Sequence, residues 1–307
     1  MSGKRIIVGG ASGLIGRALT KALDARGDKV IRLVRQAPTE ASGQDHPEFI
    51  VWGPRTGSLD PEALRGATAV VVLNGVGVGD KKWTDDRKEA IKTSRTDSVG
   101  TAARALATLG SEAPALVTAS AIGIYGDRGD DVLDEKSPPG DDFLAEVCVA
   151  WEAASLPAVQ AGVRVANMRT GIVVARGGGA LAPMLPLFKL GVGGRIGTGS
   201  QWWSWVSEAD VVGGYLAAID GVVSGPVNLV APNPVRNSEF AKTLGSVLHR
   251  PSFMPAPKLG LKIRLGSELA EAIGYASQRV QPAVLGKAGY EFVHPHLETA
   301  LAVAVGK

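Results

Sequence analysis

Three glycines near the start of the chain, Gly10, Gly13 and Gly16, have the residue type and spacing that could hold the phosphates of a dinucleotide. Glycine permits a tight turn, and it lets the backbone approach a pyrophosphate whose negative charge is stabilised by the free amides at the start of a helix. The last glycine lets that helix pack closely on a strand. The other residues predicted to contact the cofactor in this turn are Ser12, Leu14 and Ile15.

The elements around these glycines occur in the order that such a site needs. Residues 6–8 form an apolar run typical of a strand buried on both faces, and apolar residues then recur at helical spacing between 15 and 23. Gly27 suits the left-handed end of that helix, and residues 30–34 form a second strand. This βαβ order favours a dinucleotide site; the alternative is an ordinary strand-to-helix turn with extra glycines.

The end of the second strand indicates which dinucleotide would bind. An NAD site usually has Asp or Glu there, to bind the ribose 2′-hydroxyl, whereas a 2′-phosphate is met by Arg. Residues 30–35 contain no acid, and Arg35 stands at the strand end, with Arg17 or Arg32 as candidate helpers. A guanidinium can bind phosphate oxygens through two parallel hydrogen bonds. The sequence therefore predicts NADP(H) as the cofactor rather than NAD(H).

The composition excludes several classes of partner and of site. A net charge of +3, spread over 33 basic and 30 acidic residues, is too mixed to indicate nucleic acid or a membrane surface as a partner. Cys148 is the single cysteine, so an intramolecular disulfide cannot form. No apolar run approaches the ~20 residues of a membrane span, and no signal-peptide region precedes the first strand. We therefore expect a cytoplasmic protein.

Strands alternate with helices along the first 230 residues, which predicts an α/β fold with a Rossmann-type doubly wound parallel sheet. A smaller C-terminal substrate lobe would complete the fold. We expect the dinucleotide-binding domain to span residues 1–170, with 207–230 returning to it, and the lobe to comprise 171–206 and 231–307. The expected strands are 6–8, 30–34, 49–52, 69–73, 115–119, 163–168 and 227–230, and the expected helices are 15–23, 85–109, 143–154, 181–190 and 207–220.

Two further strand ends carry polar or glycine-rich segments. The strand 69–73 ends in Leu73, Asn74 and Gly75, where backbone could lie close to a ligand. The strand 115–119 is followed by Ser120 and Tyr125, whose hydroxyls could handle a proton. Because parallel strands end at one edge of the sheet, we expect both segments to border the cofactor site.

Further motifs run along nearly the whole chain. They are Trp83-Thr84, Ser94-Arg95, Trp151-Glu152, Arg169-Thr170-Gly171, Gly177-Gly178-Gly179-Ala180-Leu181, the glycine-rich stretch 188–201, Trp205-Val206-x-x-x-Asp210 and the stretch 228–234. Together with the glycine turn and the Ser120…Tyr125-Gly126 segment, they resemble the extended short-chain dehydrogenase/reductase family. More narrowly, the chain resembles an atypical branch labelled epimerase family proteins, which carries a C-terminal domain of unknown function. The resemblance implies a Rossmann-type domain that binds NADP(H), and we add Arg95, Thr170 and Ile172 to the expected cofactor-binding residues.

In family members that transfer hydride, the resemblance implies a Ser, Tyr and Lys constellation. The Tyr hydroxyl exchanges a proton with the substrate, and a Lys four residues later lowers the Tyr pKa. Ser120 matches the Ser position, but Phe143 and Val147 stand where Tyr and Lys would be, and no tyrosine in the chain has Lys four residues after it. Tyr125 is the remaining candidate for a catalytic phenol; the alternative is a tyrosine packed beneath the nicotinamide pocket.

The C-terminal lobe supplies candidate substrate contacts in Arg195, Gln201 and Trp202, where aromatic rings could stack a planar group and a guanidinium could hold an anion. The alternative is that the tryptophans cement the two lobes together. His294 and His296 lack carboxylate or Cys partners nearby in sequence, so we expect no metal site. The acidic segment 127–142 is expected to be a solvated loop that closes over the cofactor cleft.

Two functions remain open from the sequence. The first is an NADP(H)-dependent oxidoreductase or epimerase-like enzyme that acts on a small carbonyl or hydroxyl compound, or on a nucleotide-linked one, with non-standard catalytic residues. The second is a non-catalytic NADP(H) sensor or interaction module, which the missing Tyr-Lys pair favours. The helices 85–109 and 143–154 could pair in a homodimer, as they do in relatives of the family.

Overall fold

The computed structural model describes residues 3–37, 48–255 and 266–307. Its centre is a seven-stranded sheet in the order β12-β7-β5-β4-β1-β2-β3, and every neighbouring pair of strands is parallel. The α/β class and the Rossmann-type doubly wound sheet are confirmed. The strands are β1 (Arg5–Gly9), β2 (Lys29–Val34), β3 (Phe49–Val51), β4 (Ala69–Val72), β5 (Ala115–Ala121), β7 (Val165–Thr170) and β12 (Gly225–Leu229).

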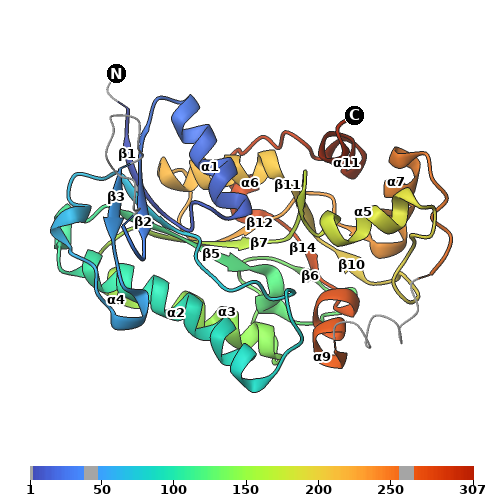
Figure 1. Cartoon of the computed structure of the whole chain (residues 1–307), viewed down its shortest axis with the longest axis horizontal. Coiled ribbons are helices and arrows are strands. Elements are labelled where there is room, and N and C mark those ends of the chain that lie inside the picture. Colours follow the sequence, from blue (N-terminus) through green and yellow to red (C-terminus); the bar gives the residue numbers. More distant parts are fainter. Residues whose placement is uncertain (1–2, 38–47, 256–265) are drawn as a thin grey trace.

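Helices cover both faces of this sheet (Figure 1). One face packs against α1 (Leu14–Ala25), α6 (Glu208–Ile219) and the short α10 (Ala283–Lys287). The other packs against α2 (Asp85–Ala107), α3 (Phe143–Ala153) and α4 (Leu156–Gln160). Short 3₁₀ turns η1 (Pro54–Thr56), η2 (Glu62–Leu64), η3 (Gly110–Glu112) and η4 (Ile122–Tyr125) connect these elements.

The central strands read as continuous apolar runs because both of their faces are covered. In β1, Ile6 and Val8 belong to the core beneath α1 and α6, whereas Ile7 belongs to the core beneath α2. Successive side chains of a strand point to opposite faces, so a strand covered on both sides has no exposed polar position. This two-sided burial holds the carboxyl ends of β1, β4, β5 and β7 in one row.

The starts of three helices are fixed by side chains that cap them. Thr84 accepts a hydrogen bond from the backbone N–H of Arg87 at the start of α2, and Asp142 accepts one from Ala145 at the start of α3. Ser207 accepts one from the N–H of Asp210 at the start of α6. These caps satisfy backbone N–H groups that have no partner within the helix.

The C-terminal half adds short strands and helices around a separate core that includes Trp203, Trp205 and Phe240. Its elements are β8 (Ile172–Ala175), β9 (Gly178–Gly179), α5 (Leu181–Lys189), β10 (Trp202–Trp203), β11 (Trp205–Ser207), β13 (Val235–Arg236), α7 (Asn237–Leu248), α9 (Ser267–Ala270), η5 (Glu271–Tyr275), β14 (Arg279–Val280) and α11 (Leu297–Val305). The exact domain boundaries given above stay a prediction, and part of the predicted lobe, 256–265, lies outside the described residues.

The segment 127–142 is a loop, as expected, apart from one two-residue strand. It contains a short strand, β6 (Val132–Leu133), that pairs in parallel with β14. Ser277 adds to this attachment, because its backbone N–H donates to Asp127 Oδ1 and its hydroxyl donates to the carbonyl of Gly129. The acidic segment is therefore bound to the C-terminal lobe, while most of its residues stay exposed.

Candidate functional site

The glycine turn between β1 and α1 has the backbone geometry that the spacing predicts. Gly10 has a φ of 78°, and a Cβ at Gly16 would lie 2.2 Å from the carbonyl oxygen of Gly10. Gly13 is the exposed N-cap of α1, and its N–H donates to the Gly10 carbonyl at 3.0 Å. Larger residues would block these approaches. The turn is a cradle at a helix N-terminus that fits a pyrophosphate.

Arginines stand at the end of β2, one strand over from this turn. Arg35 follows the last residue of β2 directly, and both Arg35 and Arg32 are exposed. Arg17 is also exposed, and its guanidinium donates to the backbone carbonyl of Ser12 within the glycine turn. No carboxylate precedes Arg35 in the strand. The position fits a 2′-phosphate, as the sequence predicts.

The end of β4 lies against the same glycine turn. A Cβ on Gly10 would approach the backbone carbon of Leu73 to 2.9 Å, and one on Gly9 would approach Asn74 Oδ1 to 2.5 Å. The Asn74 Oδ1 atom is buried and has no hydrogen-bond partner within the described residues. A buried acceptor without a donor is costly, so this atom suits a bound ligand that donates a hydrogen bond. Gly75, the next residue, is exposed at the edge.

Arg95 of α2 is a buried cation next to Gly75. Its side chain is 8% exposed, and Nη1 donates to the carbonyls of Val76 and Ile91 at 2.9 and 2.8 Å. The guanidinium also lies 4.9 Å from the ring centre of Trp151. No carboxylate is among its partners in the described part of the chain, and burial lowers the pKa of Arg95. A buried guanidinium without a counter-ion suits an anionic ligand.

A pocket of about 240 Å³ opens beside Arg95, and we call it the inner pocket. It brings together Arg95, Thr170, Ile172 and Trp202, four residues that the sequence predicts for the cofactor or substrate. Its other walls come from η4, α3, the Ser204 segment and η5. The remaining lining residues are Val78, Ala121, Ile122, Gly123, Leu144, Val147, Cys148, Trp151, Gly171, Trp203, Ser204, Ala272, Ala276 and Gln278.

Phe143 and Val147, which stand where the Tyr-Lys pair would be, lie in apolar or aromatic surroundings. Val147 lines the inner pocket with an apolar side chain. Phe143 stacks edge-on against Trp83 with ring centres 4.8 Å apart, outside the inner pocket. Neither side chain can exchange a proton, so α3 contributes shape to the pocket without acid–base chemistry.

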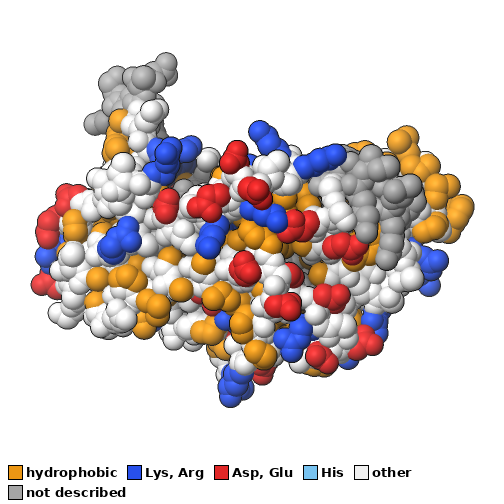
Figure 2. Space-filling model, turned by 90° about the horizontal axis from the view of Figure 1, so that it is seen from below, with side chains coloured by type: hydrophobic (Ala, Val, Ile, Leu, Met, Phe, Trp, Pro, Cys, Tyr) orange, Lys and Arg blue, Asp and Glu red, His pale blue; other side chains and the backbone are white. Residues whose placement is uncertain are grey.

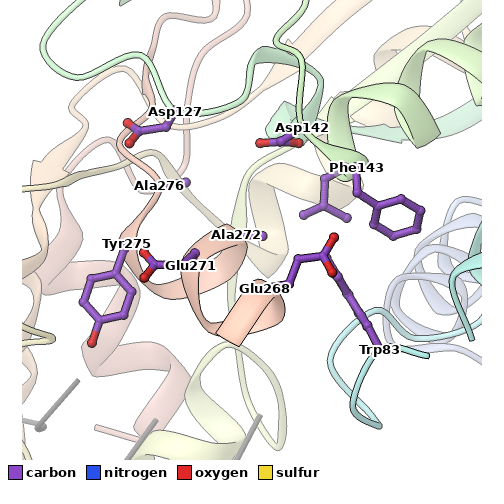
Figure 3. Close-up of a pocket in the computed structure, with 10 residues that line it drawn as sticks. Trp83, Asp127, Asp142, Phe143, Glu268, Glu271, Ala272, Tyr275 and Ala276 are labelled. Carbon is purple, nitrogen blue, oxygen red and sulfur yellow. The ribbon is translucent and has the colours of Figure 1, made fainter. Parts of the chain in front are cut away.

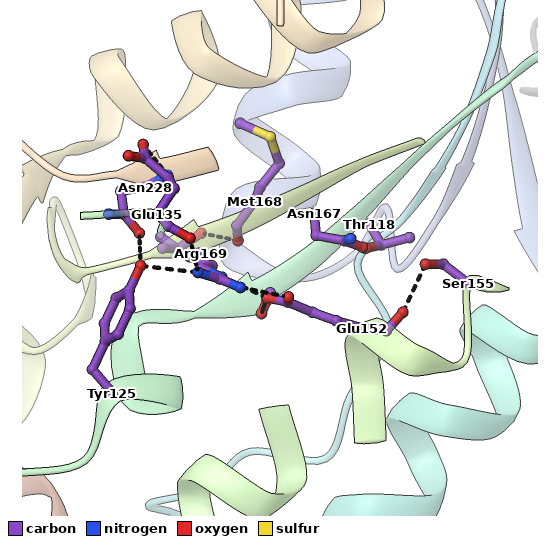
Figure 4. A network of polar contacts seen from close by, with 11 residues as sticks. Thr118, Tyr125, Glu135, Glu152, Ser155, Asn167, Met168, Arg169 and Asn228 are labelled. Atoms are coloured by element: carbon purple, nitrogen blue, oxygen red, sulfur yellow. Dashed lines mark hydrogen bonds and ion pairs between the residues drawn. The ribbon is translucent and has the colours of Figure 1, made fainter. Parts of the chain in front are cut away.

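Tyr125, Glu152 and Arg169 belong to a buried polar network (Figure 4), which the Ser120 hydroxyl joins through Glu152. Glu152 receives two parallel hydrogen bonds from Arg169, Nε–Oε1 at 2.8 Å and Nη2–Oε2 at 2.9 Å. The Ser120 hydroxyl donates to Glu152 Oε1 at 2.7 Å. The Tyr125 hydroxyl accepts from Arg169 Nη1 at 3.0 Å and donates to Asn228 Oδ1 at 2.7 Å. The network links α3, β5, β7 and β12.

This burial favours the alternative of a packed Tyr125, and a direct contact of either hydroxyl with the substrate stays a prediction. Tyr125 is fully buried, Ser120 is 3% exposed, and neither lines the inner pocket. Burial also raises the pKa of Tyr125, although the neighbouring Arg169 opposes the shift, so the phenol is a poor base at neutral pH. Burial alone would lower the pKa of Arg169, but its hydrogen bonds to Glu152 raise it overall. The geometry fits positioning roles for Ser120 and Tyr125.

The predicted substrate contacts in the C-terminal lobe have separate surroundings. Trp202 lines the inner pocket, and its ring lies between the guanidinium groups of Arg236 and Arg279, at 4.2 and 4.5 Å. The Gln201 amide is buried and donates to the carbonyls of Ile196 and Gly274. Arg195 is exposed and lines neither pocket described in this section. The structure therefore brings only Trp202 of the three to the cleft.

Cys148 and His294 do not form alternative reactive sites. Burial raises the pKa of the Cys148 thiol to about 12, which leaves it protonated and unreactive. His294 Nδ1 lies 3.1 Å from the Ser207 hydroxyl and 4.0 Å from Asp210 Oδ2, at the start of α6. Among the residues that the structure describes, no group of three or more His, Cys, Asp or Glu side chains could hold a metal ion.

A second cavity, of about 300 Å³, adjoins the inner pocket and shares Leu144, Ala272 and Ala276 with it. We call it the outer pocket (Figure 3). It is lined by aromatic and acidic side chains from four separate segments. Sequence reasoning missed this grouping, apart from the expected closure of segment 127–142 over the cleft. The other lining residues are Trp83, Asp127, Asp142, Phe143, Glu268, Glu271 and Tyr275.

Comparison with known proteins accounts for both the glycine turn between β1 and α1 and the C-terminal lobe. Residues 6–230 match the model of the NAD dependent epimerase/dehydratase family. The chain belongs to this family. Residues 256–304 also match a domain of unknown function, DUF1731, which confirms the narrower branch suggested by the sequence motifs.

Relatives within the family match this chain from end to end. "Epimerase family protein MT2273" of Mycobacterium tuberculosis is 39% identical over 305 residues, covering 99% of this chain and 98% of the relative. The crystal structure of human epimerase family protein SDR39U1, isoform 2, with NADPH has a TM-score of 0.88 at 32% identity, and covers 99% of this chain and 100% of that one. A nucleoside-diphosphate sugar epimerase structure from Corynebacterium glutamicum has a TM-score of 0.77 at 38% identity, covering 99% of this chain and 59% of that one.

No helix in the described ranges has both the length and the apolar character needed to cross a bilayer.

Proposed function

We propose that the chain binds NADP(H) along the carboxyl edge of its sheet. The glycine turn would hold the pyrophosphate, Arg35 the 2′-phosphate, and Asn74 a donor group of the cofactor. The residues present fit this cofactor, because the cradle leaves no room for a Cβ at Gly16 and Asn74 Oδ1 is buried without a partner among the residues described. The NADPH bound in the human relative supports the proposal.

The reaction would take place in the inner pocket, as an oxidoreductase or epimerase-like step on a carbonyl or hydroxyl compound. The nicotinamide, when bound, supplies the hydride donor or acceptor. Arg95 would share the charge of the pyrophosphate with the glycine turn, and the apolar wall around Val147 and Ile172 would exclude water from the nicotinamide ring. Ser120 and Tyr125 would act indirectly, by holding the ends of β5 and β7 in place through Glu152 and Arg169.

The observation that carries the NADP(H) assignment is Arg35 at the end of a β2 strand without a carboxylate. Isothermal titration calorimetry tests it directly. We expect NADPH to bind at least about tenfold more tightly than NADH, a difference of about 1.4 kcal/mol, and Arg35→Ala to bring the ratio close to one. Lys242→Ala, which removes an exposed cation from α7, is the matched control. Equal affinities in the wild type would refute the cofactor choice.

A second candidate function, NADP(H) sensing without turnover, is favoured by one observation. The positions of the proton-transfer pair hold Phe143 and Val147, and the hydroxyls of Ser120 and Tyr125 are engaged in the buried network. Incubation of the protein with NADPH and a carbonyl library, followed by absorbance, separates the two functions. Turnover supports the enzyme, whereas tight cofactor binding with no turnover supports the sensor.

A further inference from the structure

Residues 267–276, which comprise α9 and η5, border both pockets, and we call them the roof segment. Ala272 and Ala276 of this segment line the inner pocket and the outer pocket alike. Leu269 and Ala270 are buried, so the roof segment turns an apolar side towards the rest of the protein. The segment is therefore a wall that the two cavities share, and its position decides how freely one cavity communicates with the other.

The C-terminal end of the roof segment is fixed to the protein core. The hydroxyl of Ser277 accepts a hydrogen bond from the N–H of Trp202 at 3.0 Å. The side-chain amide of Gln278 donates to the carbonyls of Ile122 and Gly126 at 3.1 and 3.0 Å. These bonds hold residues 277–278 against β10 and η4. Any movement of the roof segment would therefore pivot at this end.

Next to this pivot the chain forms a π turn, η5. The N–H of Ala276 donates to the carbonyl of Glu271 at 3.0 Å, which is the hydrogen-bond spacing of a π-helix. Such turns are rare, and they occur mostly at functional sites, where the path of a helix is locally altered. Because η5 lies between α9 and the fixed Ser277, it is a place at which the roof segment can change direction while α9 stays intact.

The other end of the roof segment is joined to α2 by an ion pair. Lys88 Nζ lies 2.6 Å from Glu268 Oε1, and the two side chains are 28% and 52% exposed. Figure 3 shows the Glu268 side chain extending from α9 towards Phe143 and Trp83. Basic and acidic side chains lie close together on the face of the molecule that includes α2 and α9 (Figure 2). A partly exposed ion pair is weak, so thermal motion opens it readily.

Two aromatic rings support this ion pair. Lys88 Nζ lies 5.9 Å from the ring centre of Trp83 and 5.2 Å from that of Phe143. Aromatic rings attract an ammonium group, so the two rings hold Lys88 where it meets Glu268. Phe143 stands where the resemblance implies a proton-transferring tyrosine. A ring at this position, which cannot exchange a proton, thus helps to fasten the roof segment.

We propose that the roof segment is a lid over the inner pocket and that Lys88 and Glu268 form its latch. While the pair is formed, the segment separates the inner pocket from the outer one. When the pair opens, the segment pivots at residues 277–278, and a substrate enters through the outer pocket. This role rests on the proposed function, which places the nicotinamide and the substrate in the inner pocket. The movement itself does not depend on a cofactor.

Cys148 can report the opening of the lid. It is the single cysteine of the chain, it is 4% exposed, and it lines the inner pocket. The full chain without cofactor is mixed with an excess of dithiodipyridine, a neutral thiol reagent, and the released thiopyridone is followed by absorbance. The rate of this labelling measures how often the inner pocket opens to the reagent.

Two variants remove the latch with little change in side-chain shape. Lys88→Met keeps a long unbranched side chain without its charge, and Glu268→Gln keeps the length of the glutamate. We expect each to speed labelling of Cys148 by about three- to fivefold. Lys92→Met is the matched control, because it removes an exposed cation from the next turn of α2 and should leave the rate unchanged.

Further variants test whether these side chains act together. The double variant Lys88→Met/Glu268→Gln should be labelled no faster than the faster single variant, because both changes remove the same ion pair. Phe143→Leu should also speed labelling, and Phe143→Tyr, which keeps the ring, should do so less. Higher salt should speed labelling of the wild type more than that of Lys88→Met, because salt weakens a partly exposed ion pair.

Equal labelling rates in the wild type and in both latch variants overturn the proposal. Additive effects in the double variant, or equal acceleration by Lys92→Met, also overturn it. The free energy of unfolding, measured with urea, must be compared as well. A loss in stability large enough to account for the faster labelling overturns the proposal, because the reagent would then reach Cys148 through global unfolding.

The same assay separates this proposal from the proposed function. Bound NADPH should protect Cys148, because the nicotinamide would occupy the inner pocket. A chain that binds neither NADPH nor NADP⁺ in calorimetry overturns the proposed function, and the role of the lid in substrate entry with it. Latch-dependent labelling, which is measured without cofactor, would still support the movement of the roof segment.

Discussion

Arg169 and Glu152 form a doubly hydrogen-bonded ion pair inside the protein, between the last turns of α3 and the end of β7. Their side chains are only 9% and 15% exposed, and the pair fixes the hydroxyls of Ser120 and Tyr125. The two hydroxyls at the end of β5 are therefore buried in the interior and do not face the inner pocket. The same pair positions the wall that separates this interior from the inner pocket.

Replacement of Glu152 tests the structural weight of that pair. Glu152→Ala leaves the Arg169 charge buried without its partner, so we expect a loss of about 3 kcal/mol in the free energy of unfolding, measured with urea. Glu146→Ala, an exposed position on the same helix, should change it by about 0.5 kcal/mol or less. Equal effects for the two variants would contradict the role of the pair.

Tyr125→Phe distinguishes a structural phenol from a catalytic one. The change leaves Asn228 Oδ1 without its donor, so we expect a loss of about 1–3 kcal/mol in stability and an unchanged NADPH affinity. Thermal unfolding and calorimetry measure the two quantities. Unchanged stability combined with loss of any NADPH turnover would instead restore Tyr125 as a catalytic residue.

Two glycines of the cradle should respond differently to alanine. A Cβ at Gly13 would lie 3.3 Å from the Gly10 carbonyl oxygen, whereas one at Gly16 would lie 2.2 Å from it. We therefore expect Gly13→Ala to cost about 1 kcal/mol or less in stability but to weaken NADPH binding about tenfold, because the methyl group enters the phosphate cradle. Gly16→Ala should lose both stability and binding. Full NADPH affinity in Gly13→Ala would argue against a pyrophosphate at this turn.

Stability at alkaline pH should depend on Cys148. Burial raises the pKa of its thiol to about 12 in the folded protein, above its value in the unfolded chain. The protonated thiol therefore makes its full contribution to the free energy of unfolding below its pKa in the unfolded chain. This contribution falls as the pH rises towards the thiol pKa in the folded protein, because only the unfolded chain then releases the proton. Between about pH 9 and 11 the free energy of unfolding should fall in the wild type more steeply than in Cys148→Ala. The two slopes should differ by roughly 1 kcal/mol per pH unit. Parallel curves would show that the thiol already titrates in the folded state.

The βαβ unit could be predicted from the sequence because its signals are local. The two-sided burial of β1, the glycine spacing and the helical periodicity of α1 are each visible within a few residues. The parallel sheet follows from the repetition of this pattern. The homodimer suggested by α2 and α3 has no structural test and stays a prediction.

The outer pocket could not be predicted, because its residues meet only through tertiary contacts. Trp83 precedes α2, Asp142 caps α3, and Glu271 and Tyr275 belong to η5 near the end of the chain. The two-residue strand β6, which attaches the acidic segment to β14, is too short to produce any periodic pattern. The sequence likewise placed Ser120 and Tyr125 at a strand end but could not indicate that their hydroxyls point into the interior.

Because β6 pairs with β14, the C-terminal region cannot easily be transferred to another protein as a separate unit. The Asn228 amide donates to the carbonyl of Gln281, and the N–H of Val284 donates to Glu135. A transplanted C-terminal segment would have to reproduce each of these partners in its new host. Substitutions in this region should therefore occur together with matching substitutions at β12 and in the segment that contains β6.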